Sequence, residues 1–382
     1  MPPGPRILIA DDQPDILQAL RLLLGDAGYQ TDLVSSVRDV VDRVATDRSY
    51  DLLLMDLNYT RDTTSGTEGL DLLDRVHAAD GTLPVVVMTG WGSIETAVEA
   101  MRRGAKSFVQ KPWDDMTLVD VVRREIADGR ASRQRDARLT REHEEARLIQ
   151  RGLLPAELPS MPGCEIAALW IPASDVGGDC YDALRLSPTR TGLSIADVIG
   201  KGLPAALLMS NLQAAVRAFA TVDALPHAVC NSVNRLLCRN VAAGKFVTFC
   251  YAVVDAETRS IAYANAGHNP PILLHRDGRV DRLVATGAVL GVCADWSYAT
   301  GRLDTAPGDR LVCFTDGITE ATSPGDEQFG DARLLATIAQ HPSASAADLV
   351  NRIAAAVRNW SGDALQDDAT LVVVSFDPRD NH

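Results

Sequence analysis

Acidic residues stand at the ends of short apolar runs in the first third of this 382-residue sequence. Asp11 and Asp12 follow one such run and Asp56 ends another, while Thr89 and Lys111 follow two more. Three carboxylates brought together repel one another, and a hard, oxygen-preferring cation such as Mg²⁺ relieves that repulsion. One carboxylate can then attack phosphorus and become an acyl phosphate. The hydroxyl and the ammonium group can bind the new phosphoryl oxygens.

A second group of carboxylates occurs in the C-terminal part of the chain. Asp197 lies near the end of an apolar run, and Gly200-Lys-Gly202 after it lets the backbone turn and a ligand approach. A charge in a buried strand is expensive unless it is paired or holds a metal. Isolated acidic turns are the alternative, since Asp is a common turn residue. The other members of the group also border hydrophobic runs: Asp179, Asp316, Asp367 and Asp368.

Carboxylates with no His or Cys nearby suit Mg²⁺ or Mn²⁺ rather than zinc. If the strands bring the second group to one edge of a sandwich, two ions can share a bridging carboxylate. Such ions can also share and deprotonate a water and aim it at a phosphoryl group. The second group therefore predicts a hydrolytic site with two metal ions.

The elements that must position the first group alternate between strands and helices. Five such βα units predict a doubly wound, five-stranded parallel sheet, in which the working site lies beyond the carboxyl ends of the strands. Strands are expected at Arg6–Ala10, Gln30–Val34, Asp51–Met55, Pro84–Met88 and Lys106–Val109, with helices at about 14–27, 36–47, 67–79 and 93–103 and from about 114.

The elements around the second group are grouped instead of alternating, which favours an α+β fold with two sheets and helices outside them, an αββα sandwich. Strands are expected at 164–171, 180–186, 191–198, 246–254, 259–265, 271–275, 297–303, 309–314 and 370–376, and helices at 203–220, 225–242, 331–340 and 346–359.

A charged helical stretch connects the two parts, with only Gly129 interrupting it. Leu139, Ala146, Ile149 and Leu153 have heptad-like spacing, but over only two heptads. A solvated bridging helix and a dimerising or signalling helix both remain open. We expect domains at 1–125 and 156–377, a helical linker at 126–155 and a tail at 378–382.

The net charge of −14 argues against nucleic acid as a partner, because neutralising phosphates requires a basic face. The seven cysteines contain no C-x-x-C pair and read as reduced, mostly buried thiols. Met1-Pro-Pro-Gly-Pro5 has no apolar core for a signal peptide, and no run reaches transmembrane length. We expect a cytoplasmic protein without a membrane partner.

The N-terminal part resembles a response-regulator receiver domain. The resemblance rests on Ile7-Leu-Ile-Ala-Asp-Asp12, Leu54-Met-Asp56, Val87-Met-Thr89-Gly90 and Phe108-Val-Gln-Lys111-Pro112. It implies Asp56 as the phosphoacceptor, Asp12 as a direct Mg²⁺ ligand, Asp11 acting largely through water, and the Asn58 carbonyl as a further ligand. Thr89 and Lys111 would contact the phosphoryl group, and Phe108 would be the aromatic switch. The loop from Leu57 to Gly66 is longer and more polar than usual and lacks proline.

The C-terminal part resembles the PP2C (PPM) phosphatases, specifically their bacterial SpoIIE-like branch. The motifs that carry the resemblance are Ala146-Arg-Leu-Ile-Gln-Arg-Gly-Leu-Leu-Pro155, Val176-Gly-Gly-Asp-Cys-Tyr-Asp182, Ala196-Asp-Val-Ile-Gly-Lys-Gly-Leu-Pro-Ala-Ala206, Asn265-Ala-Gly-His-Asn-Pro-Pro271, Phe314-Thr-Asp-Gly-Ile-Thr-Glu320 and Asp367-Asp-Ala-Thr370.

This second resemblance implies that Asp197 bridges two Mn²⁺ or Mg²⁺ ions and that the Val198 carbonyl joins the first. Asp316 and Asp367 would hold the second ion, and Asp179 would bind metal directly or through water. Asp368 is an alternative to Asp367, because the sequence does not decide which of the pair faces the ions.

Two other polar residues near these motifs have two readings each. His268 is a candidate acid, but its Asn-Ala-Gly-His-Asn-Pro motif reads better as a structured turn. Lys201 is either a contact for substrate phosphate or a solvated loop lysine.

Together the two resemblances imply a two-component output protein in which phosphorylation of Asp56 by a sensor histidine kinase regulates a serine/threonine phosphatase. The implied substrate is a phosphoserine or phosphothreonine on a STAS-domain anti-sigma-factor antagonist. A homodimer through the linker helix is a further expectation. The alternative from another class is a non-catalytic adaptor that binds or sequesters a partner, although all the metal-site carboxylates are present.

Overall fold

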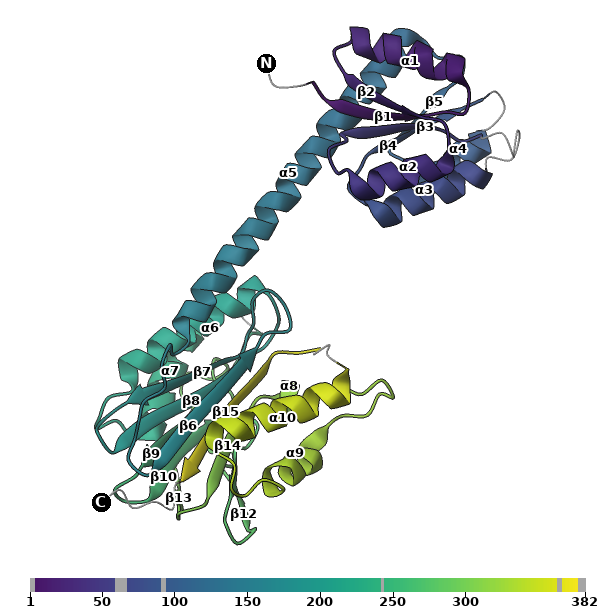
Figure 1. Ribbon diagram of the computed structural model, residues 1–382. Coiled ribbons are helices and arrows are strands. Elements are labelled where there is room, and N and C mark those ends of the chain that lie inside the picture. The colour runs from purple at the N-terminus through teal and green to yellow at the C-terminus, as the bar shows by residue number, and fades with distance from the viewer. Residues whose placement is uncertain (1–3, 59–66, 91–93, 242–243, 363–365, 377–382) are drawn as a thin grey trace. The chain divides into compact units, whose positions relative to one another are not determined.

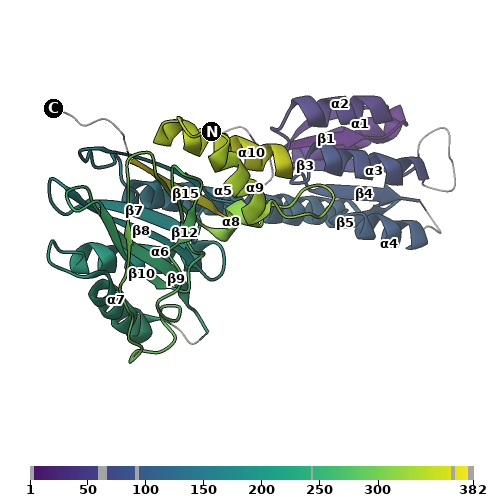
Figure 2. The same cartoon turned by 90° about the horizontal axis from the view of Figure 1, so that it is seen from below.

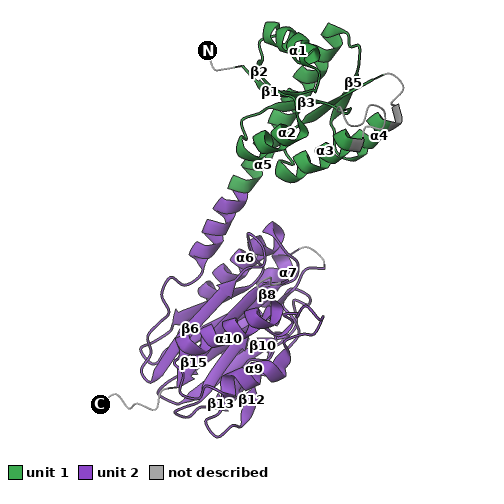
Figure 3. Cartoon of the chain, turned by 45° about the vertical axis from the view of Figure 1, so that its right-hand side comes forward, with its two compact units in different colours: residues 1–141 green, residues 142–382 purple. Residues whose placement is uncertain are grey.

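The computed structural model describes residues 4–58, 67–90, 94–241, 244–362 and 366–376, which form two compact units, 1–141 and 142–382 (Figure 3). Most of the long loop after Asp56 (residues 59–66) and the tail at 378–382 lie outside the described residues. No helix in the described part combines the length and the apolar character needed to span a bilayer. All seven cysteines lie in the described ranges, and none forms a disulfide; Cys293 is exposed.

The N-terminal unit is the doubly wound parallel sheet that the sequence predicts, with strand order β2-β1-β3-β4-β5 (Figure 1). Helices α1 and α5 cover one face, where Leu20 and Val122 pack against Ile9; α2, α3 and α4 cover the other face. The elements are β1 (Arg6–Ala10), α1 (Pro14–Asp26), β2 (Gln30–Val34), α2 (Val37–Thr46), β3 (Leu52–Asp56), α3 (Thr67–Ala79), β4 (Val85–Thr89), α4 (Ile94–Arg102) and β5 (Ser107–Gln110).

Helix α5 (Asp115–Leu153) begins as the last helix of the receiver-like unit and continues without a break through Gly129. Its N-terminal part packs on the first sheet through Leu118, Val122 and Ile126. Its last turns, from Glu142 onward, belong to the second compact unit. The expected continuation of the last receiver helix is therefore confirmed.

The C-terminal unit is an αββα sandwich of two five-stranded antiparallel sheets, β13-β10-β9-β8-β7 and β12-β11-β14-β15-β6. Ile195 and Ala252 from one sheet pack against Leu311 and Val372 from the other. Helices α6 and α7 cover the outer face of the first sheet, and α9 and α10 cover that of the second (Figures 1 and 2). This arrangement confirms the predicted fold class.

The strands of this unit are β6 (Cys164–Ile171), β7 (Cys180–Arg185), β8 (Arg190–Val198), β9 (Val247–Asp255), β10 (Ser260–Ala266), β11 (Ile272–Leu274), β12 (Val280–Arg282), β13 (Gly301–Asp304), β14 (Arg310–Phe314) and β15 (Ala369–Phe376). The helices are α6 (Leu203–Phe219), α7 (Pro226–Asn240), α8 (Asp316–Thr319), α9 (Gly330–Ala339) and α10 (Ala346–Ser361).

The strand expected at 297–303 is wrong in its first half, because the observed strand is Gly301–Asp304. Tyr298 in this segment is buried, but its backbone N–H donates to the side chain of Asn231 on α7. The N–H of Ala299 donates to the carbonyl of Thr286 in a loop. The backbone of this segment is therefore paired outside a sheet ladder. The short elements β12 and α8 were not expected.

Candidate phosphoacceptor and metal sites

The first site lies at the carboxyl ends of β1, β3 and β5. Ligand oxygens of Asp11, Asp12 and Asp56 lie within 4.8 Å of one another, and no other group of three or more His, Cys, Asp or Glu in the described residues is as compact. Lys111 Nζ lies 2.6 Å from Asp11 Oδ2 and 3.1 Å from Asp56 Oδ2. Parallel strands that end side by side thus bring together residues that are up to 100 positions apart in sequence.

The electrostatics of this cluster fit a bound cation. Burial raises the pKa of Asp56; the Lys111 ammonium opposes this shift and the Asp11 charge adds to it. Asp12 Oδ1 and Asp56 Oδ1 are buried, and neither has a hydrogen-bond partner in the described structure. Buried carboxylate oxygens normally have partners. A hard divalent cation with an oxygen preference would satisfy both.

The remaining receiver-type residues lie on or directly after β3, β4 and β5. Thr89 ends β4 and is buried, and its carbonyl accepts a 2.7 Å hydrogen bond from the Lys111 N–H. Asn58 follows β3 by two residues, and its backbone N–H hydrogen-bonds to the Asp56 carboxylate. Phe108 on β5 is 48% exposed. Its ring therefore lies at the surface, where an aromatic switch could change position.

The second site gathers around Asp197 near the end of β8, where it pairs with Thr248 of β9. The pKa of Asp197 is raised to about 7. Burial is the largest cause, and the negative charges of Asp316, Asp367 and Asp368 add to it. These acids come from the ends of β14 and β15 on the other sheet. The structure thus brings together charges from both sheets at one edge of the sandwich.

Asp179 lies just before β7 and is 1% exposed. Its Oδ2 accepts hydrogen bonds from Thr315 Oγ1 at 2.6 Å and Thr370 Oγ1 at 2.8 Å. Burial raises its pKa well above the usual range, and the neighbouring Asp197 charge adds to the shift. Sequence reasoning missed both threonines, although each stands inside a quoted motif, directly before Asp316 and three residues after Asp367.

The two neighbouring carboxylates at the start of β15 have different surroundings. Asp368 accepts backbone hydrogen bonds from Ala173 at 2.8 Å, Gly178 at 2.6 Å and Asp179 at 3.3 Å. Asp367 instead has a half-exposed side chain that lies 3.1 Å from Lys201 Nζ. The Asp368 carboxylate therefore binds three backbone N–H groups of another loop, whereas among the described residues that of Asp367 accepts only its neighbour's N–H, at 2.9 Å, besides pairing with Lys201.

The structured-turn interpretation of His268 agrees with its contacts. Its N–H donates to Asn265 Oδ1 at 2.8 Å, and the Asn265 amide donates back to the His268 carbonyl at 3.0 Å. The ring is buried, and its Nδ1 lies 2.8 Å from Thr248 Oγ1. Burial lowers the pKa of His268 to about 4, which keeps the imidazole neutral near pH 7.

The turn after Asp197 and the side chain of Lys201 also have observed positions. Gly202 precedes the first residue of α6 with φ +71° and ψ −157°, a conformation that glycine adopts without strain. Lys201 Nζ donates to the Gln366 carbonyl at 2.7 Å besides pairing with Asp367. Lys201 thus bridges two loops of the site.

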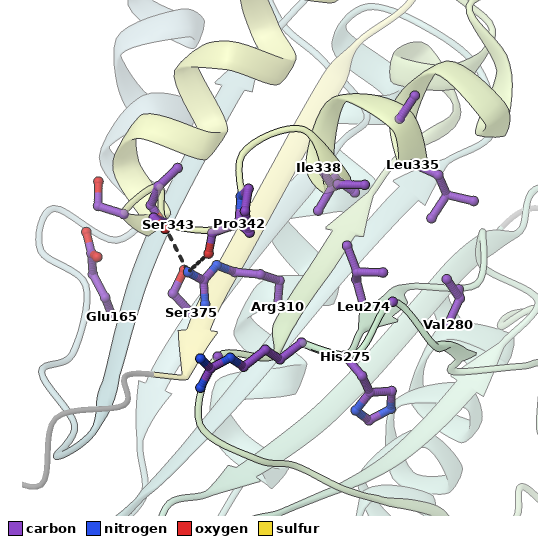
Figure 4. A pocket seen from close by; sticks show the side chains of 17 residues that line it. Glu165, Leu274, His275, Val280, Arg310, Leu335, Ile338, Pro342, Ser343 and Ser375 are labelled. Carbon is purple, nitrogen blue, oxygen red and sulfur yellow. Dashed lines mark hydrogen bonds between the residues drawn. The ribbon is translucent and has the colours of Figure 1, made fainter.

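A separate pocket of about 910 Å³ lies between β11, β14 and the connection from α9 to α10 (Figure 4). Arg310 Nη2 donates to the carbonyls of Pro342 and Ala344 at 3.1 and 3.2 Å, and His275 lies between Asp309 and Asp281. None of the sequence-predicted site residues lines this pocket.

Comparison with known proteins gives two family matches. Residues 187–377, half of the chain, match the family described as Stage II sporulation protein E (SpoIIE), and residues 7–123 match the response regulator receiver domain. The phosphoserine phosphatase RsbU of Bacillus subtilis (strain 168) is 34% identical over 235 residues, which are 61% of this chain and 69% of RsbU.

Two solved structures resemble the C-terminal unit. The RsbU and RsbW domains of a Mycobacterium tuberculosis protein are 26% identical with a TM-score of 0.52, covering 60% of this chain and 64% of that one. The SiaA-PP2C domain of Pseudomonas aeruginosa is 23% identical with a TM-score of 0.56, covering 64% of this chain and 98% of that one, and supports the fold. The chain therefore belongs to the SpoIIE family of metal-dependent protein serine/threonine phosphatases, here joined to a response-regulator receiver domain.

Proposed function

We propose that phosphorylation of Asp56 by a cognate sensor histidine kinase controls hydrolysis of phosphoserine or phosphothreonine on a protein substrate. The observation that carries the proposal is helix α5. It begins four residues after Lys111 of the receiver cluster, and its last turn contacts the backbone two residues before Asp179 of the phosphatase cluster. Helix α5 is therefore the continuous element through which a change at the receiver cluster would reach the phosphatase cluster.

In the receiver, Asp12 would hold Mg²⁺ directly, Asp11 through water, and Asn58 through its carbonyl. Lys111 lies between Asp11 and Asp56, so its ammonium group is already beside the acceptor oxygen. A phosphoryl group on Asp56 would compete for this ammonium and for the Thr89 hydroxyl. Phosphorylation would therefore draw the Lys111 ammonium from Asp11 toward the phosphoryl group, with no residue from outside the cluster needed.

In the phosphatase, Asp197 would bridge two Mg²⁺ or Mn²⁺ ions, with the Val198 carbonyl on the first and Asp316 and Asp367 on the second. Asp179 would contribute directly or through water. Such ions lower the pKa of a water and polarise a phosphoryl group. We assign Asp367 to metal binding in preference to Asp368, because Asp368 already accepts three backbone hydrogen bonds.

The chain's own side chains prepare this site. Thr315 and Thr370 fix the Asp179 carboxylate, and Asp368 fixes the loop in front of it. Burial and the repulsion of neighbouring carboxylates together raise the pKa of Asp197 to about 7, and divalent cations would relieve that repulsion on binding. Lys201 neutralises Asp367 at the rim until an ion replaces it.

The substrate we propose is a phosphoserine-bearing STAS-domain anti-sigma-factor antagonist. RsbU, to which the chain is 34% identical, is itself named a phosphoserine phosphatase. The direct test is hydrolysis of such a protein by wild type and by Asp197→Ala, with Mn²⁺ and with EDTA. Asp277→Ala, on an exposed turn, is the matched control. Metal-dependent turnover that only the Asp197 variant loses is the expected result.

Regulation is tested with an acyl-phosphate mimic such as beryllofluoride on wild type and Asp56→Asn. We expect the mimic to change turnover by wild type only. Unchanged turnover in both proteins would refute control by Asp56 while leaving the phosphatase in place. Stable binding of the phosphoprotein with no turnover in any state would favour the non-catalytic adaptor.

A homodimer through α5 is part of the proposal. Leu139, Leu148 and Ile149 on this helix are 46%, 70% and 68% exposed, which leaves apolar surface uncovered on a highly charged helix. We expect light scattering to give a dimer mass for wild type and a monomer mass for Ile149→Glu. A monomer mass for wild type would refute this part.

A further inference from the structure

Gln150 differs from every residue around it on α5. Between positions 127 and 160, all of which the structure describes, it is the only buried residue. Its exposed fraction is 2%, whereas that of the preceding residue, Ile149, is 68%. Burying a carboxamide is unfavourable unless its donor and acceptor both find partners. The burial of Gln150 therefore points to a specific contact.

One residue, Gly177, satisfies both ends of this carboxamide. Gln150 Nε2 donates to the Gly177 carbonyl at 2.6 Å, and the Gly177 N–H donates to Gln150 Oε1 at 3.0 Å. The two bonds together define the orientation of the amide. A glutamate could not replace it, because a carboxylate has no donor for the carbonyl. An asparagine would be one methylene shorter.

Gly177 opens the loop Gly177–Asp179, whose next two residues are held by Asp368. Asp368 Oδ2 accepts from the N–H groups of Gly178 at 2.6 Å and Asp179 at 3.3 Å. A Cβ atom on Gly177 would collide with the same carboxylate, so no larger residue fits there without displacement. Gln150 and Asp368 together thus hold the backbone of all three residues of the loop that ends at Asp179.

The end of α5 has a second attachment that does not involve the loop. Gln213 Nε2 and Arg217 Nη2 on α6 donate to the Leu153 carbonyl at 2.6 and 3.1 Å. Arg217 also pairs with the buried Asp182 of β7. These contacts fix where the helix ends, whereas Gln150 reaches the metal-site loop itself. All of them lie within the 142–382 unit.

We propose that Gln150 is a positioning residue whose carboxamide sets the Gly177–Asp179 loop and, through it, the metal affinity of the cluster around Asp197. A rotation or withdrawal of the last turn of α5 would break both hydrogen bonds at once and release the loop. The inference rests on the proposed function and names the contact through which α5 acts on the site.

The test compares Gln150→Glu and Gln150→Leu in the full chain with the same two substitutions at Gln134, an exposed glutamine on the same helix. Mn²⁺ binding is measured from the electron paramagnetic resonance signal of free Mn²⁺. The Mn²⁺ that binds to the receiver is measured in Asp197→Ala and subtracted. Hydrolysis of p-nitrophenyl phosphate is followed over a Mn²⁺ titration. Loss of an outer hydrogen-bond partner at a metal site commonly changes affinity or activity about 10- to 100-fold.

We expect both Gln150 variants to need at least about tenfold more Mn²⁺ for half-saturation. Their kcat at saturating Mn²⁺ should return toward the wild-type value, because a merely misfolded site would not recover. The Gln134 variants should match wild type. Wild-type Mn²⁺ binding in both Gln150 variants would overturn the proposal.

Two further outcomes also test the proposal: a variant that does not fold and a wild type without phosphatase activity. If Gln150→Glu does not fold, as judged by circular dichroism, Gln150→Asn keeps the amide on a shorter side chain and carries the same expectation. If the wild type binds Mn²⁺ but hydrolyses nothing, the proposed function fails. The binding comparison still decides the role of Gln150 in that case.

Discussion

The two threonine hydroxyls on Asp179 allow a quantitative prediction. Thr315→Val and Thr370→Val each remove one donor from a buried carboxylate and preserve side-chain shape. A hydrogen bond to a charged group contributes about 1.5–3 kcal/mol, which corresponds to roughly 10- to 100-fold in an equilibrium constant. Without the donor, the already raised pKa of Asp179 rises further, and a protonated carboxyl is a poor metal ligand. Metal affinity should fall by about that factor.

The two substitutions should not be equal. Thr315 Oγ1 also accepts a 2.9 Å hydrogen bond from the Thr370 N–H, which is buried. Thr315→Val therefore leaves that N–H without its side-chain acceptor, at a further cost of about 1–3 kcal/mol in the free energy of unfolding. We expect Thr315→Val to be the more damaging variant both in stability and in Mn²⁺ affinity.

The assay is a Mn²⁺ titration of phosphatase activity beside urea unfolding of the metal-free protein. Thr191→Val is the control, because Thr191 is buried in the same strand as Asp197 but at its other end. Equal effects of Thr315→Val and Thr370→Val, or effects no larger than that of Thr191→Val, would refute the reasoning.

Three other predictions concern stability. The pKa of His268 lies near 4 in the folded protein and near 6.5 when unfolded, so the unfolded chain binds more protons between these pH values. Its contribution of about 3 kcal/mol is present above pH 6.5 and lost as pH falls toward 4; His268→Gln should flatten this part of the urea-unfolding pH profile, and an unchanged slope would contradict it. Arg217→Met leaves the buried Asp182 carboxylate without its cation and should destabilise the protein by about 1–3 kcal/mol, more than Asp182→Asn does; the reverse order in urea unfolding would show that Arg217 does not stabilise this carboxylate. Mn²⁺ at 100 times its Kd should stabilise the wild type by about 2.7 kcal/mol over EDTA in thermal unfolding, and Asp197→Ala should lose most of this increment; an undiminished increment would place the ions elsewhere.

Most of the architecture could be predicted because hydrophobic runs of strand length were bounded by acids and glycines. The parallel strands of the receiver place their carboxyl ends together by topology alone, so the sequence was enough to group Asp11, Asp12 and Asp56. Asp197 and Asp316 were grouped on the same principle, although one lies in β8 of the first sheet and the other follows β14 of the second. In both places the signal was a charge at a position where burial is costly.

The residues that the sequence did not identify act through the backbone or through a single hydroxyl. Gln150 stands in a charged helical stretch, where a glutamine has no distinguishing pattern, and its role follows from its contact with Gly177. The distinction between Asp367 and Asp368 likewise depends on which carboxylate meets the amide groups of another loop. The segment before Gly301 has an apolar pattern because Tyr298 is buried, and burial alone does not distinguish a strand from a packed loop.

The pairing of β6 with β15 has a consequence for expressing the phosphatase alone. Every residue of β15, from Ala369 to Phe376, is buried, and β6 supplies its neighbour along the full length. A fragment trimmed to the family match at residue 187 would lack β6 and leave an eight-residue apolar edge open. Open edges of this kind pair with other chains and aggregate. A fragment that starts at Glu142 keeps the last turns of α5 and β6, so β15 stays paired along its full length.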